Sequence, residues 1–356
     1  MTRIDCHAHA FPSTAEMATK TMSFLDDWVP GSWREPLQSI GGQVGGLLGP
    51  LKSLVGGTVK SVTPVADQLG VEAWKQFNRL VGDDYPMPKG SEELRAFREK
   101  LSPNVLKTLE YAMSAGLGPS MLLQGTLENL IASMERAGLD KTVVIGAPPI
   151  ADNQWLLETL KDDDRFIPVI TLPRLPADAG ELAWEIALNK AVDLGAKGFK
   201  VHINIDGMAP EFLGYRMMFR VAQERGVFVI IHTGCFHVPG YKIAGGIEPA
   251  SFENHVSRHP GVRVCFAHMN RDHPERALEM VNRHKNVYVD TSWQSVTTVR
   301  QALDTIPLDK ILLGSDWPLL NDDLQVENTR IVEEACTSEQ ARVILGENAE
   351  QFIDGN

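Results

Sequence analysis

Short apolar runs that alternate with helical patterns constrain this chain more than any other feature of its sequence. One run lies at the start of the chain, and seven more follow one another from residue 141 to residue 316. Near-continuous apolar runs of this kind are typical of parallel strands whose sheet is covered by helices. The predicted strands are Arg3–His7, Lys141–Gly146, Arg165–Leu172, Ala196–His202, Val227–His232, Val262–His268, Val287–Thr291 and Lys310–Asp316.

Helical patterns follow most of these runs after short connections, as in an α/β protein. Eight strand–helix units match a closed (β/α)8 TIM barrel better than an open, doubly wound sheet, which is the alternative. We therefore expect residues 1–356 to form a single barrel domain. The predicted helices are one around Leu127–Met134 and then Trp155–Leu160, Ala179–Leu194, Glu211–Arg225, Ala250–Ser257, Pro274–His284 and Ser295–Leu303.

One long segment, residues 12–123, breaks this rhythm. It is rich in glycine and proline at first, and then has helical patterns at Ala73–Leu80 and Ser91–Gly116. The segment follows the first strand, on the face where barrels carry their active sites. We interpret it as a mostly helical insertion that forms a lid or a wall of the substrate pocket. An arm for oligomer assembly is the alternative.

Composition and charge exclude several classes of function. The formal net charge is −12, and we find no stripe rich in lysine and arginine, so nucleic acid is not expected as a partner. The chain has neither a signal-peptide pattern nor a long apolar stretch, so no membrane association is expected. The four cysteines lack CxxC spacing, which favours a reducing, cytoplasmic setting.

Polar residues stand at the ends of several apolar runs. His7 and His9 form an H-x-H pair whose side chains share one face of the first strand. His232, His268 and Asp316 end the fifth, sixth and eighth strands, and each one singly fits a polar strand end. Together, however, four imidazoles and a carboxylate converge on one rim, and burying them without a cation would be costly.

A divalent metal resolves this problem, because imidazole and carboxylate are ligands for zinc, manganese and iron. We expect zinc, with manganese or iron as alternatives. Lys200 lies near the end of the fourth strand in the sequence GFKVH.

The segments IDCHAHAFP, GFKVH, VIIHTG, CFAHMN, VYVDTS, LLGSDWP and LGENAEQF together resemble the amidohydrolase superfamily. The best match is its amidohydrolase-related branch, which includes aminocarboxymuconate-semialdehyde decarboxylase and related hydroxybenzoate decarboxylases. The resemblance covers residues 1–12 and about 124–356, and the insertion lies outside it. These motifs in this order are specific for the superfamily, but they do not choose a reaction.

The resemblance implies two alternative metal sites. In the decarboxylase branch, His7, His9, His232 and Asp316 would bind a single ion, and His268 would act as an acid, a base or a polarising group. In the two-metal branch, which resembles phosphotriesterase, a carbamylated Lys200 would bridge two ions and His232 and His268 would hold the second ion. In either case Asp316 is also a candidate to accept the proton of an attacking water.

Further residues are candidates for binding a substrate. Arg174 and Arg271 follow the third and sixth strands, and either guanidinium would suit a substrate carboxylate, although both also fit as surface residues. His202 lies two residues after Lys200 on the same strand face, and His237 lies in the loop after the fifth strand. Trp293 and Trp317 would suit the walls of an aromatic pocket, and Trp317 matches an aromatic position of the resembled family.

Three functions are compatible with these patterns. The first is a metal-dependent hydrolase acting on an amide, ester or lactone of a small organic acid. The second is a non-oxidative decarboxylase of an aromatic or muconate-like carboxylic acid. The third is a non-catalytic binding barrel, against which the complete ligand set argues. A homo-oligomer is expected in each case.

Overall fold

The computed structural model describes most of the barrel and part of the insertion. The described residues are 2–13, 71, 74–75, 77–87, 91–98, 100–102, 104–110, 124–148, 150–176, 178–234, 247–319 and 323–355. Most of the predicted insertion at residues 12–123, and the loop that contains His237, lie outside them.

Eight parallel strands form one sheet in the order of the sequence, from β1 to β8. The sheet closes on itself, because Cys6 N donates to Leu313 O (2.8 Å) and His9 N donates to Trp317 O (2.7 Å). The predicted TIM barrel is thus confirmed, and the open sheet is excluded. The strands are β1 Ile4–His9, β2 Lys141–Ile145, β3 Phe166–Thr171, β4 Gly198–Val201, β5 Phe228–His232, β6 Val264–Ala267, β7 Val287–Asp290 and β8 Ile311–Leu312.

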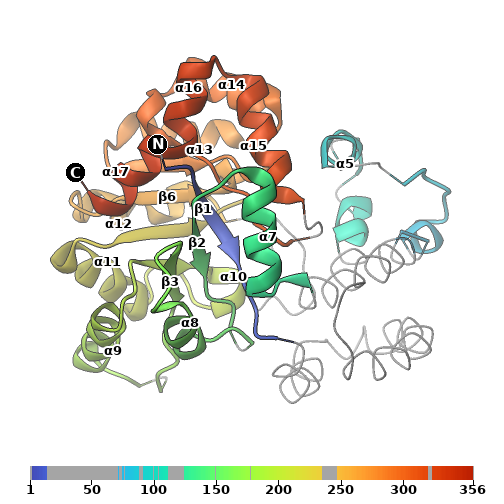
Figure 1. The fold of residues 1–356 in the computed structure, drawn as a ribbon. Helices are drawn as coiled ribbons and strands as arrows, with labels where there is room; N and C mark the ends of the chain where they lie inside the picture. The colour runs from blue at the N-terminus through green and yellow to red at the C-terminus, as the bar shows by residue number, and fades with distance from the viewer. Residues whose placement is uncertain are drawn as a thin grey trace.

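Helices surround the sheet, and the described part of the insertion lies to one side of the barrel (Figure 1). Side chains at helix starts fix several boundaries: Thr126, Asp152 and Ser295 each accept a bond from a backbone N–H of the first turn. The helices are α5 Ser91–Arg98, α7 Leu127–Ala137, α8 Asn153–Leu160, α9 Glu181–Asp193, α10 Ile203–Asp206, α11 Leu213–Arg225, α12 Glu253–Arg258, α13 Pro274–Arg283, α14 Val296–Thr305, α15 Leu324–Ala335, α16 Ser338–Arg342 and α17 Asn348–Asp354.

The apolar core has two main layers. A large cluster fills the space between the strands and the helices, and a smaller one fills the barrel interior. At the N-terminal ends of the strands, Phe352 of α17 closes the interior by packing on Phe228 (ring centroids 4.7 Å apart) and Tyr288 (5.0 Å). Gly198 faces the Phe228 ring so closely that a Cβ there would lie 2.5 Å from it.

The helices differ from the sequence-based expectations in two respects. The insertion helix predicted at Ser91–Gly116 is interrupted, because residues 100–102 form a turn between α5 and the helical residues 104–110. Ser102 precedes a proline in the sequence, and the residue before proline is disfavoured in helical geometry. In addition, four helices were not predicted from the sequence, namely α10, α15, α16 and α17.

Within the part of the chain that the structure describes, the helices are too short or too polar to span a lipid bilayer.

Candidate metal centre

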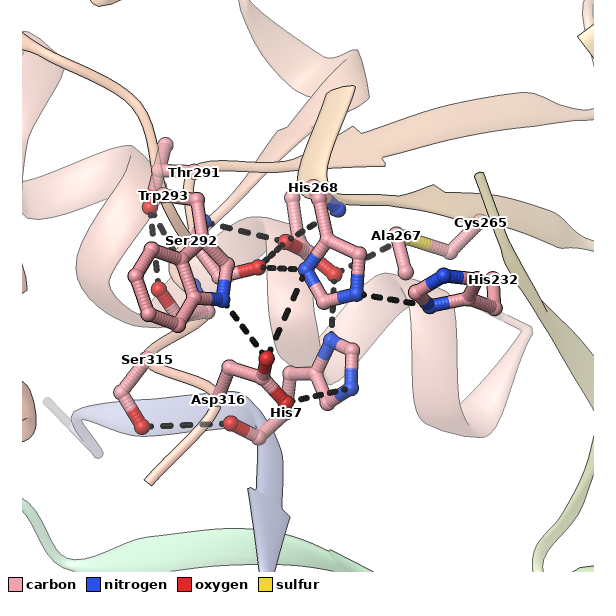
Figure 2. Close-up of polar contacts among 12 residues, drawn as sticks. His7, His232, Cys265, Ala267, His268, Thr291, Ser292, Trp293, Ser315 and Asp316 are labelled. Atoms are coloured by element: carbon pink, nitrogen blue, oxygen red, sulfur yellow. Dashed lines mark hydrogen bonds and ion pairs between the residues drawn. The ribbon is translucent and has the colours of Figure 1, made fainter. Parts of the chain in front are cut away.

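The predicted residues at the strand ends come together at the C-terminal mouth of the barrel (Figure 2). His7 and His9 lie on β1, where the pairing with β2 shifts register between Asp5 and Ala8. Such irregularities re-aim side chains near functional sites. His7 is fully buried, whereas the side chain of His9 keeps 22% of its exposure and faces the mouth.

Hydrogen bonds orient both imidazoles of β1. His7 Nδ1 lies 2.9 Å from Asp290 Oδ2, and a carboxylate only accepts, so Nδ1 carries the proton and Nε2 the lone pair. His9 Nδ1 donates in the same way to Ile145 O at 3.2 Å. Both Nε2 lone pairs therefore face away from the strand and toward the mouth.

These two lone pairs meet Asp316. Asp316 Oδ1 lies 3.2 Å from His9 Nε2 and 3.4 Å from His7 Nε2. The other carboxylate oxygen, Oδ2, accepts the indole N–H of Trp293 at 2.6 Å. Three acceptor atoms that face one another at such distances repel, unless a proton or a cation lies between them.

His268 and His232 form the opposite side of the cluster. His268 Nδ1 lies 2.7 Å from Ser292 Oγ, and the Ser292 hydroxyl in turn donates to Asp290 Oδ1. His268 Nδ1 is therefore the donor, and its Nε2 accepts from His232 Nδ1 at 3.1 Å. This assignment leaves the lone pair on His232 Nε2, a buried atom without a hydrogen-bond partner among the described residues.

The chemistry of these donors fits a divalent metal. His7, His268 and Asp316 each offer one ligand atom, and these atoms lie within 4.8 Å of one another. The predicted four-ligand set differs from this group by having His9 and His232 in place of His268. His9 Nε2 lies 3.2 Å from Asp316 Oδ1, and His232 Nε2 has no hydrogen-bond partner among the described residues, so both atoms remain predicted ligands.

Burial controls the charge of the cluster. It lowers the pKa of His268 to about 3, and it also lowers the pKa values of His7, His202 and His232. The imidazoles are accordingly neutral at pH 7, which is the form that binds metals. Burial also lowers the pKa of Lys200 to about 8.

Lys200 of β4 and His202, which directly follows this strand, lie in the same region. Lys200 Nζ lies 3.0 Å from His7 Nε2, so its ammonium donates to the lone pair that a metal would also need. One lone pair cannot serve both, and metal binding to His7 therefore requires Lys200 to give up this bond. The ring of His202 stacks on that of His232, with centroids 3.9 Å apart.

The loops that carry these residues have unusual backbones. Every residue from His268 to Arg271 has a positive φ, between 45° and 61°, and Trp293 and Asp316 have φ values of 62° and 60°. Such conformations are costly for residues other than glycine, and they persist only where the surroundings enforce them. Here Gln294 Nε2 donates to His268 O at 2.6 Å, and Asn270 N donates to the Thr233 hydroxyl at 3.1 Å.

The remaining predicted residues differ in their placement. Arg271 is buried, with its guanidinium carbon 5.0 Å from the centre of the Trp293 ring. Arg174 is exposed, and no hydrogen bond or ion pair joins it to the cluster within the described ranges. Trp317 is fully buried in the large apolar cluster, and its role in a pocket stays a prediction. His237 lies outside the described residues.

The sequence analysis assigned no role to Asp290, Ser292 or Glu110. Asp290 orients His7 through its side chain and accepts the backbone N–H of His268 at 3.0 Å, so it links the two sides of the cluster. Its position at the end of the seventh strand was a signal that could have identified it. Glu110 lies within the insertion, where no motif points to it.

A sequence model of the amidohydrolase family matches residues 4–354. This match spans almost the whole chain, which therefore belongs to the amidohydrolase family, as the motifs indicated. Members of this family are enzymes and typically use a divalent metal. No functionally curated protein matches the sequence.

Solved structures share the fold at low sequence identity. One is an uncharacterized TIM-barrel protein from Bordetella bronchiseptica, with 17% identity, a TM-score of 0.54, and coverage of 74% of this chain and 90% of that one. Another is 5-carboxyvanillate decarboxylase from Sphingomonas paucimobilis, with 14% identity, a TM-score of 0.52, and coverage of 74% of this chain and 95% of that one. A third is 2,6-dihydroxybenzoate decarboxylase from Rhizobium, with 17% identity, a TM-score of 0.51, and coverage of 66% of this chain and 91% of that one.

Proposed function

We propose that this chain is a metal-dependent hydrolase that acts on an amide, ester or lactone of a small organic acid. One observation carries the proposal: Asp316 Oδ1 lies 3.4 Å from His7 Nε2 and 3.2 Å from His9 Nε2, although Asp316 and the two histidines come from opposite ends of the sequence. His7, His9, His232 and Asp316 would hold the ion. When bound, the ion would supply Lewis-acid polarisation of a substrate oxygen or of water.

The chain's own residues supply the proton transfers. Asp316 borders both the proposed ion site and the open mouth, so it would accept a proton from the attacking water. Trp293 keeps this carboxylate in place through its bond to Oδ2. His268 would accept a proton at Nε2, where it accepts a hydrogen bond from His232 Nδ1 in this structure, since Ser292 and Asp290 fix the proton on its Nδ1.

The substrate acid would bind at the rim of the same mouth. Arg271 is the candidate for its carboxylate, because its guanidinium lies against Trp293, whose indole N–H contacts Asp316. Arginine matches a carboxylate with two parallel hydrogen bonds, which would orient the substrate as well as bind it. His202 and the loop residue His237 are further candidates for substrate contacts.

Non-oxidative decarboxylation is the second candidate, and a specific observation favours it. Two proteins that share this fold are decarboxylases of aromatic acids, 5-carboxyvanillate and 2,6-dihydroxybenzoate. In this reaction the carboxylate leaves as CO2, and a proton must be given to the ring carbon. His268 or Asp316 would deliver that proton from the same positions.

One experiment separates the candidates. The zinc-loaded protein is incubated with a panel of lactones, esters and amides of small acids, and with a panel of hydroxybenzoates. Acid release is followed by pH-stat titration, and CO2 is measured separately. We expect net acid production without CO2, whereas CO2 from a hydroxybenzoate would transfer the assignment to the decarboxylase. Ligand binding without turnover in either panel would contradict both and favour the non-catalytic barrel.

A further inference from the structure

A buried chain of charged side chains joins the insertion to the mouth of the barrel. Glu110 belongs to the helical residues 104–110 of the insertion, and Arg271 follows β6. Glu110 Oε1 lies 2.6 Å from Arg98 Nη2 and 3.7 Å from Arg271 Nη1. Arg98 Nη2 also contacts Asp272 at 3.3 Å. The insertion and the loop after β6 are therefore connected through charges and not through apolar packing alone.

Three of these side chains are withdrawn from water. Glu110 is 2% exposed, Arg271 5% and Arg98 8%. Placing three charged groups in a low-dielectric environment is costly, and pairing offsets this cost only in good geometry. A buried ion pair is thus a weak device for stability, and its better-supported use is to fix one arrangement among several.

Apolar contacts already stabilise the described part of the insertion. Trp74, Phe77 and Leu109 form a separate apolar cluster there, and Phe97 and Tyr85 pack around it. Leu109 directly precedes Glu110, so this cluster holds the helix that carries the carboxylate. The helix therefore holds Glu110 in place, where its Oε1 atom lies between Arg98 of α5 and Arg271 of the barrel.

The arginine that Glu110 contacts stands next to the proposed catalytic residues. The backbone of Arg271 has a φ of 53°, and its carbonyl oxygen accepts from Gln294 Nε2 at 3.2 Å. At Gly234, which follows the neighbouring strand β5, a Cβ would lie 2.6 Å from the Arg271 Cβ. The barrel thus fixes the backbone of Arg271, and the contact with Glu110 bears on the orientation of the Arg271 side chain.

We propose that Glu110 is a positioning residue, which sets the orientation of the Arg271 guanidinium so that it can bind a carboxylate of the substrate. The insertion then completes the recognition site for an acidic substrate. This inference rests on the proposed function in one respect, namely the assignment of Arg271 to the substrate acid. It does not depend on which reaction follows.

Binding of a carboxylate probe tests the inference independently of turnover. The probe is salicylate, and salicylamide is its uncharged counterpart; both are titrated calorimetrically into the zinc-loaded protein. In Glu110→Gln we expect salicylate to bind about tenfold more weakly, on the scale of one charge-assisted hydrogen bond, and salicylamide to bind as before. Glu110→Asp keeps the charge on a shorter side chain and should lie between the two proteins. Glu93→Gln, an exposed glutamate of α5, is the matched control.

A double-mutant cycle tests whether Glu110 changes salicylate affinity through Arg271. If Glu110 acts through Arg271, then Glu110→Gln should no longer change salicylate affinity once Arg271→Met is present. Unchanged affinity in Glu110→Gln, an equal loss for both probes, or tighter salicylate binding would each overturn the proposal. Unchanged affinity would mean that Glu110 has no role in binding, and an equal loss for both probes would mean that its role is only structural. Tighter salicylate binding would mean that Glu110 only screens the positive charge of the arginines. Failure of wild type to bind salicylate would also overturn it.

The proposed function can fail separately. A protein without turnover in the substrate panels, but with salicylate binding that depends on Glu110 and Arg271 together, would refute the hydrolase and retain the positioning role.

Discussion

The two ends of the barrel are built from the same eight strands, yet they differ in chemistry. At the N-terminal ends, the aromatic rings of Phe352, Phe228 and Tyr288 close the interior. At the C-terminal ends, buried imidazoles and carboxylates converge with their lone pairs directed at one another. Apolar packing stabilises the first end, whereas the second end buries lone pairs that face one another and that a proton, a cation or a substrate would satisfy.

The backbone differs in the same way. All the non-glycine residues with positive φ in the described part of the chain lie in the loops after β6, β7 and β8, at the mouth. Strained conformations cluster at functional sites because the rest of the fold can sustain their cost. Residues that stabilise the fold and residues of the proposed site thus lie at opposite ends of the barrel. Substitutions at the N-terminal end should lower the free energy of unfolding, and substitutions at the mouth should lower activity.

The largest effect is expected from Asp316→Asn at the mouth. This change removes the carboxylate from the proposed ligand set, so turnover should fall by about a thousandfold or more, as expected when several kcal/mol of stabilisation are lost. Zinc content by elemental analysis should also fall, while the melting temperature of the metal-free protein stays close to wild type. His273→Gln, an exposed histidine, is the control. Retained full activity in Asp316→Asn would refute the site.

At the opposite end, Phe352→Ala should affect stability and not chemistry. Phe352 is fully buried between two aromatic rings, so its truncation leaves a cavity and should cost about 3–5 kcal/mol of unfolding free energy. Denaturant unfolding measures this loss. The folded fraction should bind zinc with the stoichiometry of wild type, and a lost metal site would show that the two ends are not separable.

Much of the barrel could be predicted because each strand corresponds to a short, continuous apolar run in the sequence. The runs that contain Val143, Ile230 and Phe266 are visible without knowledge of the rest of the chain. The positions of His7, His232 and Asp316 followed from the rule that strand ends meet at one mouth. Each predicted strand matched an observed one, although β8 is short and Asp316 lies in the turn that follows it.

Other parts depend on contacts between distant residues and left no local signal. Glu110 and Arg271 are 161 positions apart, and no pattern in either segment predicts their ion pair. The place of Asp290 at a strand end marked it as a candidate, but its role in orienting His7 is given only by the three-dimensional hydrogen bonds. The interrupted insertion helix, by contrast, could have been predicted from the proline that follows Ser102.

Lys200→Met tests whether the Lys200 ammonium opposes metal binding at the mouth. In the wild type, the Lys200 ammonium competes with a cation for the lone pair of His7 Nε2. Removal of its positive charge should tighten zinc binding by about tenfold at pH 7, since two like charges close together repel. Chelator competition gives the affinity and elemental analysis the stoichiometry, which we expect to stay unchanged. A halved stoichiometry would instead support a bridged pair of ions.

An effect of similar size to that of Lys200→Met, but of opposite sign on zinc affinity, is expected from Trp293→Phe, which tests whether the loop after β7 serves the site. The substitution keeps an aromatic ring beside Arg271 but removes the N–H that donates to Asp316 Oδ2. Loss of one hydrogen bond to a charged group should lower kcat/KM by about tenfold and weaken zinc binding by a similar factor. Trp184→Phe, a buried tryptophan of α9 in the outer layer, should lower only stability. Equal effects of the two substitutions on zinc affinity would mean that Trp293 contributes packing and that Asp316 is held by the backbone alone.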